Sequence, residues 1–231
     1  MNNRTRRIAE FGLLTALALV LGLIDRAVPL SALLSGSVPG LKLGLANTVL
    51  LFAVYRMDGK AAVLLMLTKV ILSGFLFGSL SAMLYSFSGG VLSLAVMLGA
   101  KKNPRIAALC AAACALLSEV LLLARNPAPR GQMLTVTLLI FAALLAALGL
   151  FFLLRKKPEL GVLAVSLAGA VAHNVGQVAA AALVLKTPLL LTVYLPVLSG
   201  LGAAVGCLTG IVARQVLRVL KETPKKPPEA A

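Results

Sequence analysis

Runs of about 20 apolar residues recur along this chain, and they restrict its fold more than any other feature. A helix needs about 20 consecutive apolar residues to cross the hydrocarbon core of a bilayer. Of the 231 residues, 60% are hydrophobic and 13% are charged, which is typical of membrane proteins. We therefore predict an all-α integral membrane protein with about eight spanning helices, at residues 8–24, 41–55, 61–77, 80–100, 106–124, 133–154, 160–185 and 189–220.

The spans predict one transmembrane domain over residues 1–220, and the lysine- and proline-rich residues 221–231 predict a disordered tail. The first apolar run follows Arg4, Arg6 and Arg7, as a signal peptide would. Asp25 and Arg26 stand where a small-residue cleavage site would be expected, so we interpret the run as a retained helix.

The placement of basic residues predicts the orientation of the helices. With the amino terminus inside, 16 of the 22 basic residues fall in cytoplasmic segments and five in outer segments, while Lys69 lies within the membrane. This positive-inside bias predicts a multi-pass protein of the cell membrane with both termini in the cytoplasm. The basic residues do not gather on one soluble face with stacking aromatics, so nucleic acid is not the expected partner.

Polar residues inside the apolar runs are the candidates for function. Residues 169–177 carry the only histidine, two carboxamides and two glycines in the middle of a span, and such groups must face protein or a water-filled cavity. With the predicted orientation, the polar residues are biased towards the outer half of the membrane. We predict an outward-facing substrate pocket formed by Lys42, Asn47, Lys69, Ser73, Tyr85, His173, Asn174, Gln177 and Tyr194.

Alternatives to a binding role exist for two of these residues. A single histidine in a helix bundle is also common as a packing residue. An intramembrane lysine has either a counter-charge or an anionic ligand, and Glu119 is the acidic residue expected at a comparable depth. If Glu119 pairs with Lys69, then Lys69 is structural.

The sequence also lacks several signatures of catalysis. It has no Gly-x-x-x-x-Gly-Lys-Ser/Thr loop for nucleotide hydrolysis. Asp25 and Asp58 are the only aspartates, and their separation makes a magnesium-diphosphate site unexpected. The three cysteines, Cys110, Cys114 and Cys207, are too few for a metal site. We expect no enzymatic activity, no metal and no cofactor.

Several motifs in the same order resemble the Gx transporter family, whose members are often labelled heptaprenyl diphosphate synthase component I. These motifs occupy residues 39–47, 69–78, 85–90, 173–177 and 194–196. That family is similar to the substrate-binding S components of energy-coupling factor (ECF) transporters. The resemblance implies a six-helix S-component-like bundle whose pocket is roofed by the first loop, over residues 26–40.

The resemblance also implies partners, namely a shared transmembrane subunit and two cytoplasmic ATPases. Gly12 and Ala16 form a small-residue face on the first helix that would serve as the docking surface, although packing within the chain would explain it equally well. The chain departs from the family pattern over residues 101–159, where two additional helices, at about 106–154, are predicted. This insertion puts the accessibility of the docking surface in doubt.

The expected function is therefore a membrane substrate-binding subunit for uptake of a small anionic or amphipathic molecule, energised by separate ATPases. A second hypothesis is an accessory membrane subunit, without a transport cycle, for isoprenoid or quinone biosynthesis or flavin-linked redox assembly. A third, a membrane enzyme with His173 as the base, lacks an evident second catalytic group.

Overall fold

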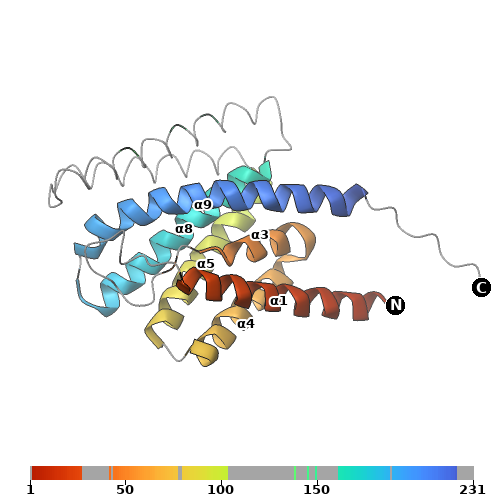
Figure 1. The fold of residues 1–231 in the computed structure, drawn as a ribbon, viewed down its shortest axis with the longest axis horizontal. Helices are drawn as coiled ribbons and strands as arrows, with labels where there is room; N and C mark the ends of the chain where they lie inside the picture. The colour runs from red at the N-terminus through yellow and green to blue at the C-terminus, as the bar shows by residue number, and fades with distance from the viewer. Residues whose placement is uncertain are drawn as a thin grey trace, which may run out of the picture.

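Six helices make up the described structure (Figure 1). The computed structural model describes residues 2–27, 42, 44–77, 80–103, 138, 145, 149, 161–187 and 189–222. Every extended regular element within these ranges is helical: α1 (Asn3–Ala27), α3 (Asn47–Arg56), α4 (Gly59–Phe77), α5 (Leu80–Lys102), α8 (Gly161–Val184) and α9 (Leu189–Glu222). The predicted helix at 106–124 lies outside the described residues, as do all but residues 138, 145 and 149 of the predicted helix at 133–154, most of the first loop and the tail from residue 223.

Five of the described helices, α1, α4, α5, α8 and α9, are long and apolar enough to cross a membrane. This confirms the prediction of a multi-pass membrane protein. Helix α9 continues to Glu222, two residues into the predicted tail, and the disorder of the tail stays a prediction.

Helix α3 is much shorter than the predicted helix at 41–55. It begins at Asn47 and has ten residues, so it is about 15 Å long, roughly half the thickness of the hydrocarbon core. The backbone of Gly44 has a φ of 89°, which is a left-handed conformation that a regular helix cannot contain. The chain therefore enters α3 through a non-helical stretch, residues 42 and 44–46, which we call the entry segment.

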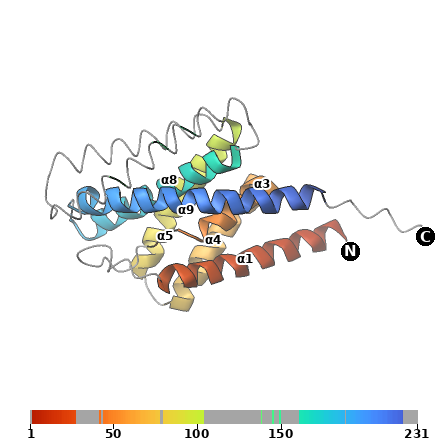
Figure 2. The ribbon, with the colours of Figure 1, turned by 45° about the horizontal axis from the view of Figure 1, so that its top comes forward.

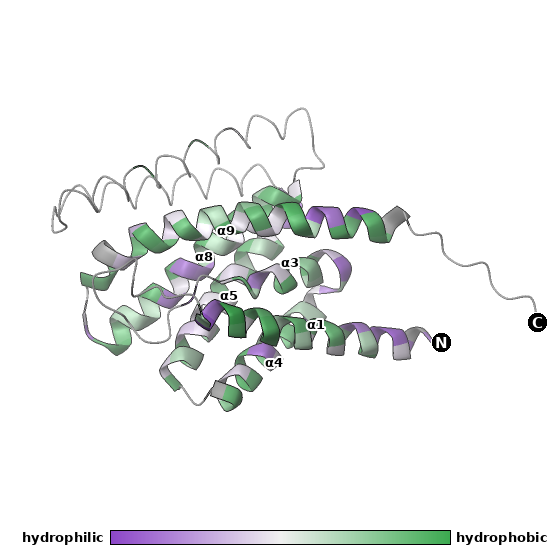
Figure 3. Cartoon of the chain, viewed as in Figure 1, coloured by the Kyte–Doolittle hydropathy of each residue, from purple (hydrophilic) through white to green (hydrophobic). Residues whose placement is uncertain are grey.

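One end of the bundle carries ion pairs between α1 and the α3–α4 turn. Arg7 approaches Asp58 at 3.9 Å, and Arg56 approaches Glu10 at 3.6 Å. The amino-terminal end of α1 and the carboxy-terminal end of α9 lie at this same end of the molecule in both views (Figures 1 and 2). Hydrophilic residues also gather at these two helix ends, whereas the middle of the bundle is mainly apolar (Figure 3).

Helix α8 is the central helix of the described bundle. In its spanning part 72% of the residues are buried, compared with 28% in α1 and in α4. It packs mainly against α5 and α9. The expectation that the polar residues of 169–177 are enclosed agrees with this burial, because His173, Asn174 and Gln177 are 3%, 0% and 0% exposed.

Glycines allow the neighbouring helices to approach the α8 backbone closely. On α9, Gly202, Gly206 and Gly210 recur every four residues and face α8; a Cβ at Gly206 would lie 3.1 Å from the Leu167 Cα. On the other side, a Cβ at Gly176 would lie 2.9 Å from the Gly89 Cα of α5. In a membrane, where burial from water does not drive association, such close van der Waals packing is a main source of helix–helix stability.

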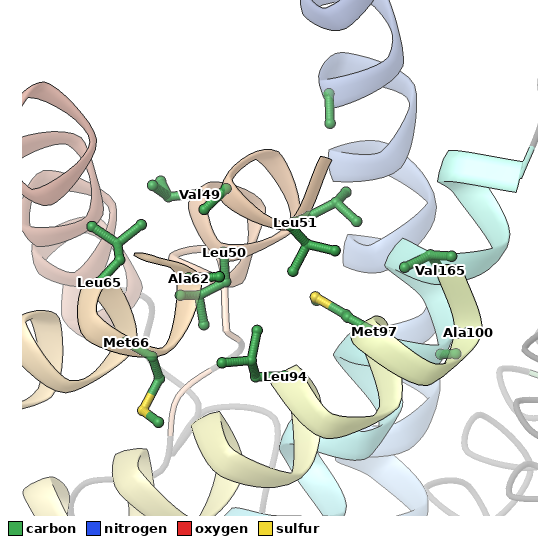
Figure 4. Packing of buried hydrophobic residues seen from close by; sticks show 14 of the residues in the cluster. Val49, Leu50, Leu51, Ala62, Leu65, Met66, Leu94, Met97, Ala100 and Val165 are labelled. Carbon is green, nitrogen blue, oxygen red and sulfur yellow. The ribbon is translucent and has the colours of Figure 1, made fainter. Parts of the chain in front are cut away.

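A cluster of apolar side chains fills the space between α3, α4, α5 and α8 (Figure 4). Leu50 and Leu51 of α3 are completely buried, as is Leu65 of α4. Met97 of α5 and Val165 of α8 extend the same cluster. This packing holds the short helix α3 inside the bundle, with its amino-terminal end at the polar centre described next.

Candidate functional site

The entry segment carries backbone groups into the interior of a membrane protein, where water cannot satisfy them. Asp25, near the end of α1, accepts hydrogen bonds through Oδ2 from the backbone N–H groups of Gly44 and Leu45, each at 2.9 Å. Non-helical backbone is tolerated at membrane depth only where such partners exist or where it lines a cavity. The carboxylate also lies at the amino-terminal end of α3, where the helix dipole favours a negative charge.

Gln177 of α8 holds the entry segment from the opposite side. Its Nε2 donates to the Lys42 carbonyl at 2.6 Å, and its Oε1 accepts from the Lys42 backbone N–H at 3.2 Å. Nε2 also donates to Asn174 Oδ1 at 2.8 Å, and Asn174 Nδ2 donates to the Leu198 carbonyl of α9. Both carboxamides therefore already bind protein atoms, and this geometry makes them positioning groups for the entry segment and α9.

A small cavity lies between the entry segment and helices α1, α4, α5 and α8. Its volume is about 10 Å³, which is enough for about one water molecule. The lining residues are Ala18, Gly22, Asp25, Lys42, Gly44, Ala46, Lys69, Ser73, Ser86 and His173. Four of the predicted binding residues, Lys42, Lys69, Ser73 and His173, thus meet at one place.

The cavity holds an unequal number of opposite charges. Lys42 and Lys69 are 9% and 8% exposed, and Asp25 is 2% exposed. Asp25 interacts electrostatically with both ammonium groups, and Lys42 Nζ also donates to Ser86 Oγ at 3.5 Å. Two ammonium groups and one carboxylate leave one formal positive charge in excess among the described residues that line the cavity. Buried charge is costly unless a partner compensates it.

Several polar atoms around this cavity find no hydrogen-bond partner in the described part of the chain. They are Asp25 Oδ1 and both amide atoms of Asn47, whereas His173 Nδ1 lies against the Gly89 backbone of α5. Asn47 does not line the cavity itself, but it lies beside it, because a Cβ on Gly44 would be 3.0 Å from His173 Cδ2 and 3.1 Å from Asn47 Nδ2. Buried polar groups are normally satisfied, so this group of atoms indicates a site built for water or a ligand.

The two tyrosines of the predicted site lie elsewhere. Tyr85 is 1% exposed and packs in a separate apolar cluster with Val178 and Leu198, and the half-buried Tyr194 packs against the same cluster. Neither tyrosine lines the cavity. Depth along a helix can be read from sequence, whereas the direction in which each helix faces depends on how the bundle packs.

Asp25 and Ser86 are the polar lining residues that the sequence analysis missed. Asp25 was used only to argue against a signal-peptide cleavage site and a magnesium site, and Glu119, which lies outside the described residues, was taken as the acidic candidate for Lys69. A signal was available, because Ala18, Gly22 and Asp25 have the i, i+4, i+7 spacing that places three residues on one helix face. That face lines the cavity.

The predicted docking residues lie on a different face of α1. Gly12 and Ala16 are exposed, and a Cβ on Gly12 would meet no described atom within 4 Å. Docking of a partner at this face remains a prediction.

Comparison with known proteins gives one family. The family described as heptaprenyl diphosphate synthase component I matches in two segments, residues 14–124 and 120–216, which together span most of the chain. No curated protein and no solved structure gives a match. This multi-pass membrane protein therefore belongs to the heptaprenyl diphosphate synthase component I family.

Proposed function

We propose that this membrane protein is a substrate-binding subunit for uptake of a small anionic or amphipathic molecule, energised by separate ATPase partners. The observation that carries the proposal is the set of buried charged and unpartnered polar groups around one cavity in an otherwise apolar bundle. The excess positive charge favours an anion, because a negative group would compensate the second lysine.

In the proposed function the protein must change conformation to bind its ligand, because the cavity is too small to hold one. A space of about 10 Å³ holds no molecule much larger than water, so the structure corresponds to a closed state. The entry segment is the wall best suited to move, because its contacts with α1 and α8 are made by side chains and not by a continuous helical hydrogen-bond ladder. Lys42 would then move with it and act as both a ligand contact and part of the closure.

Two features support external ATPases as the energy source. The sequence contains no nucleotide-binding loop of the Gly-x-x-x-x-Gly-Lys-Ser/Thr type. The small-residue face at Gly12 and Ala16 is exposed, so it is open to a second transmembrane helix.

The proposal predicts that Lys69 is needed for ligand retention. Native mass spectrometry of protein purified in mild detergent is expected to show a bound small molecule in the wild type. Lys69→Gln should retain it at least about tenfold less, since a hydrogen bond to a charged group contributes about 1.5–3 kcal/mol. Lys60→Gln, which changes an exposed lysine on the same helix, is the matched control and should retain the molecule fully. Equal retention by the wild type and Lys69→Gln would contradict the proposal.

A second function is favoured by the family description, which refers to a component of a prenyl diphosphate synthase. In that role the protein would be an accessory subunit that binds a lipid head group or an isoprenoid precursor without transporting it. Affinity purification from the native membrane separates the two functions. Co-purifying ATPases support uptake, and a co-purifying prenyltransferase or oxidoreductase supports the accessory role.

A further inference from the structure

We propose that the ligand of this site is a monoanion that carries a hydroxyl or N–H donor beside its negative group. Lys42 and Lys69 would bind the negative group, and Asp25 would accept the hydrogen bond. This inference rests on the proposed substrate-binding function and narrows its ligand to a polar class, distinct from a simple carboxylate or a prenyl chain.

The two oxygens of Asp25 have different roles. Oδ2 is occupied by the N–H groups of Gly44 and Leu45. Oδ1 is buried and has no hydrogen-bond partner among the described residues, although Asp25 lines the cavity. An ionised carboxylate oxygen can only accept hydrogen bonds, so a group that satisfies Oδ1 must be a donor.

The charge of the ligand follows from the charged residues that line the cavity. Arg26 also acts electrostatically on Lys42, but it is exposed and does not line the cavity. Lys42, Lys69 and Asp25 together have a formal charge of plus one, and a ligand with one negative charge would make the occupied site neutral. A dianion would leave a negative excess, and a neutral or zwitterionic ligand would leave the positive excess in place. Uncompensated charge is costly at membrane depth, so the monoanion is favoured.

The shape of the cavity wall fits a compact ligand. The side facing α1 and the start of α3 is lined by Ala18, Gly22, Gly44 and Ala46, which are all small. A Cβ on Gly22 would meet no described atom within 4 Å, so no described side chain presses on this wall. In the open state the carbon skeleton of the ligand would lie against it, with its polar end towards Lys69.

Matched pairs of sodium salts test the donor requirement. The melting temperature of the detergent-solubilised wild type would be measured at increasing concentrations of each salt, which gives an apparent Kd for each anion. The apparent Kd of lactate would then be compared with that of propionate, and the apparent Kd of glycolate with that of acetate. Members of a pair have the same charge and differ only by one hydroxyl group. We expect the hydroxylated anion to bind at least about tenfold more tightly, as the loss of a hydrogen bond to a charged partner would imply.

Asp25→Asn tests whether Asp25 is the residue that reads the hydroxyl group. The asparagine carbonyl can still accept the Gly44 and Leu45 hydrogen bonds, but its NH2 group replaces the acceptor at Oδ1. In Asp25→Asn the preference for lactate over propionate should fall to less than about twofold. The control is Asp58→Asn, which changes the second aspartate of the chain at an exposed position and should keep the preference. If Asp25→Asn does not fold, the wild-type pairs still decide the question.

The possible outcomes separate this inference from the proposed function. Equal binding of lactate and propionate by the wild type would overturn the donor requirement and leave the anion site intact. Preservation of the lactate preference in Asp25→Asn would overturn the assignment to Asp25. The absence of any response to all four anions would overturn the inference, while the proposed function is decided separately by ligand retention in the wild type and Lys69→Gln.

Discussion

Asp25→Ala is expected to destabilise the folded bundle by about 3–5 kcal/mol, the cost typical of removing one partner of a buried charge pair. The substitution would leave Lys69 and Lys42 without their carboxylate, and it would remove the acceptor of the Gly44 and Leu45 N–H groups. The free energy of unfolding in mixed detergent–SDS micelles measures the effect.

Two variants show which part of Asp25 matters. Asp25→Asn can keep the backbone hydrogen bonds and loses only the charge, so it should lie between the wild type and Asp25→Ala. Asp58→Asn removes the charge of a side chain that is 58% exposed but keeps an oxygen that accepts the Ala61 N–H at the start of α4, so it should change stability by no more than about 0.5 kcal/mol. Unfolding of Asp25→Ala at the wild-type SDS fraction would show that Asp25 does not hold the entry segment.

Gly176→Ala is expected to lower stability by about 1–3 kcal/mol, as overpacking of a tightly packed interior typically does. Its Cβ would lie 2.7 Å from the Ser88 carbonyl oxygen and 2.9 Å from the Gly89 Cα. Both are backbone atoms, so the two helices must separate. Unfolding in mixed micelles again measures the change.

The matched control is Gly99→Ala, on α5. A Cβ there would meet no described atom within 4 Å, so its stability should be unchanged or slightly higher, because alanine is the better helix former. The α5–α8 crossing also positions His173, since a Cβ on Gly89 would be 2.7 Å from His173 Nδ1. Gly176→Ala should therefore weaken ligand retention as well, and normal stability in this variant would contradict the close crossing.

The long apolar helices were predictable because their signal is local and repeated many times. The predicted span at 160–185 agrees with α8, Gly161–Val184, and its central position followed from the polar residues that it must bury. The meeting of Lys42, Lys69, Ser73 and His173 at one cavity was also predicted, since polar side chains inside apolar helices must find a common enclosure. Their role in binding a ligand stays a prediction.

The features that were missed depend on contacts between distant parts of the chain. Residues 41–55 read as one continuous apolar helix. The break at Gly44 depends on hydrogen bonds that its backbone donates to Asp25, 19 residues earlier, and on Gln177, 135 residues after Lys42, which binds the Lys42 backbone. The Gly202, Gly206 and Gly210 repeat was visible in the sequence, but only the fold shows that it faces α8.

The way in which the entry segment is held has a consequence for the integrity of the membrane. Asp25 and Gln177 hold its backbone from two sides through four hydrogen bonds, and lifting Lys42 strains all of them together. In the proposed uptake function, opening would therefore be concerted, and partial openings that let ions leak across the bilayer would be suppressed while no ligand is bound.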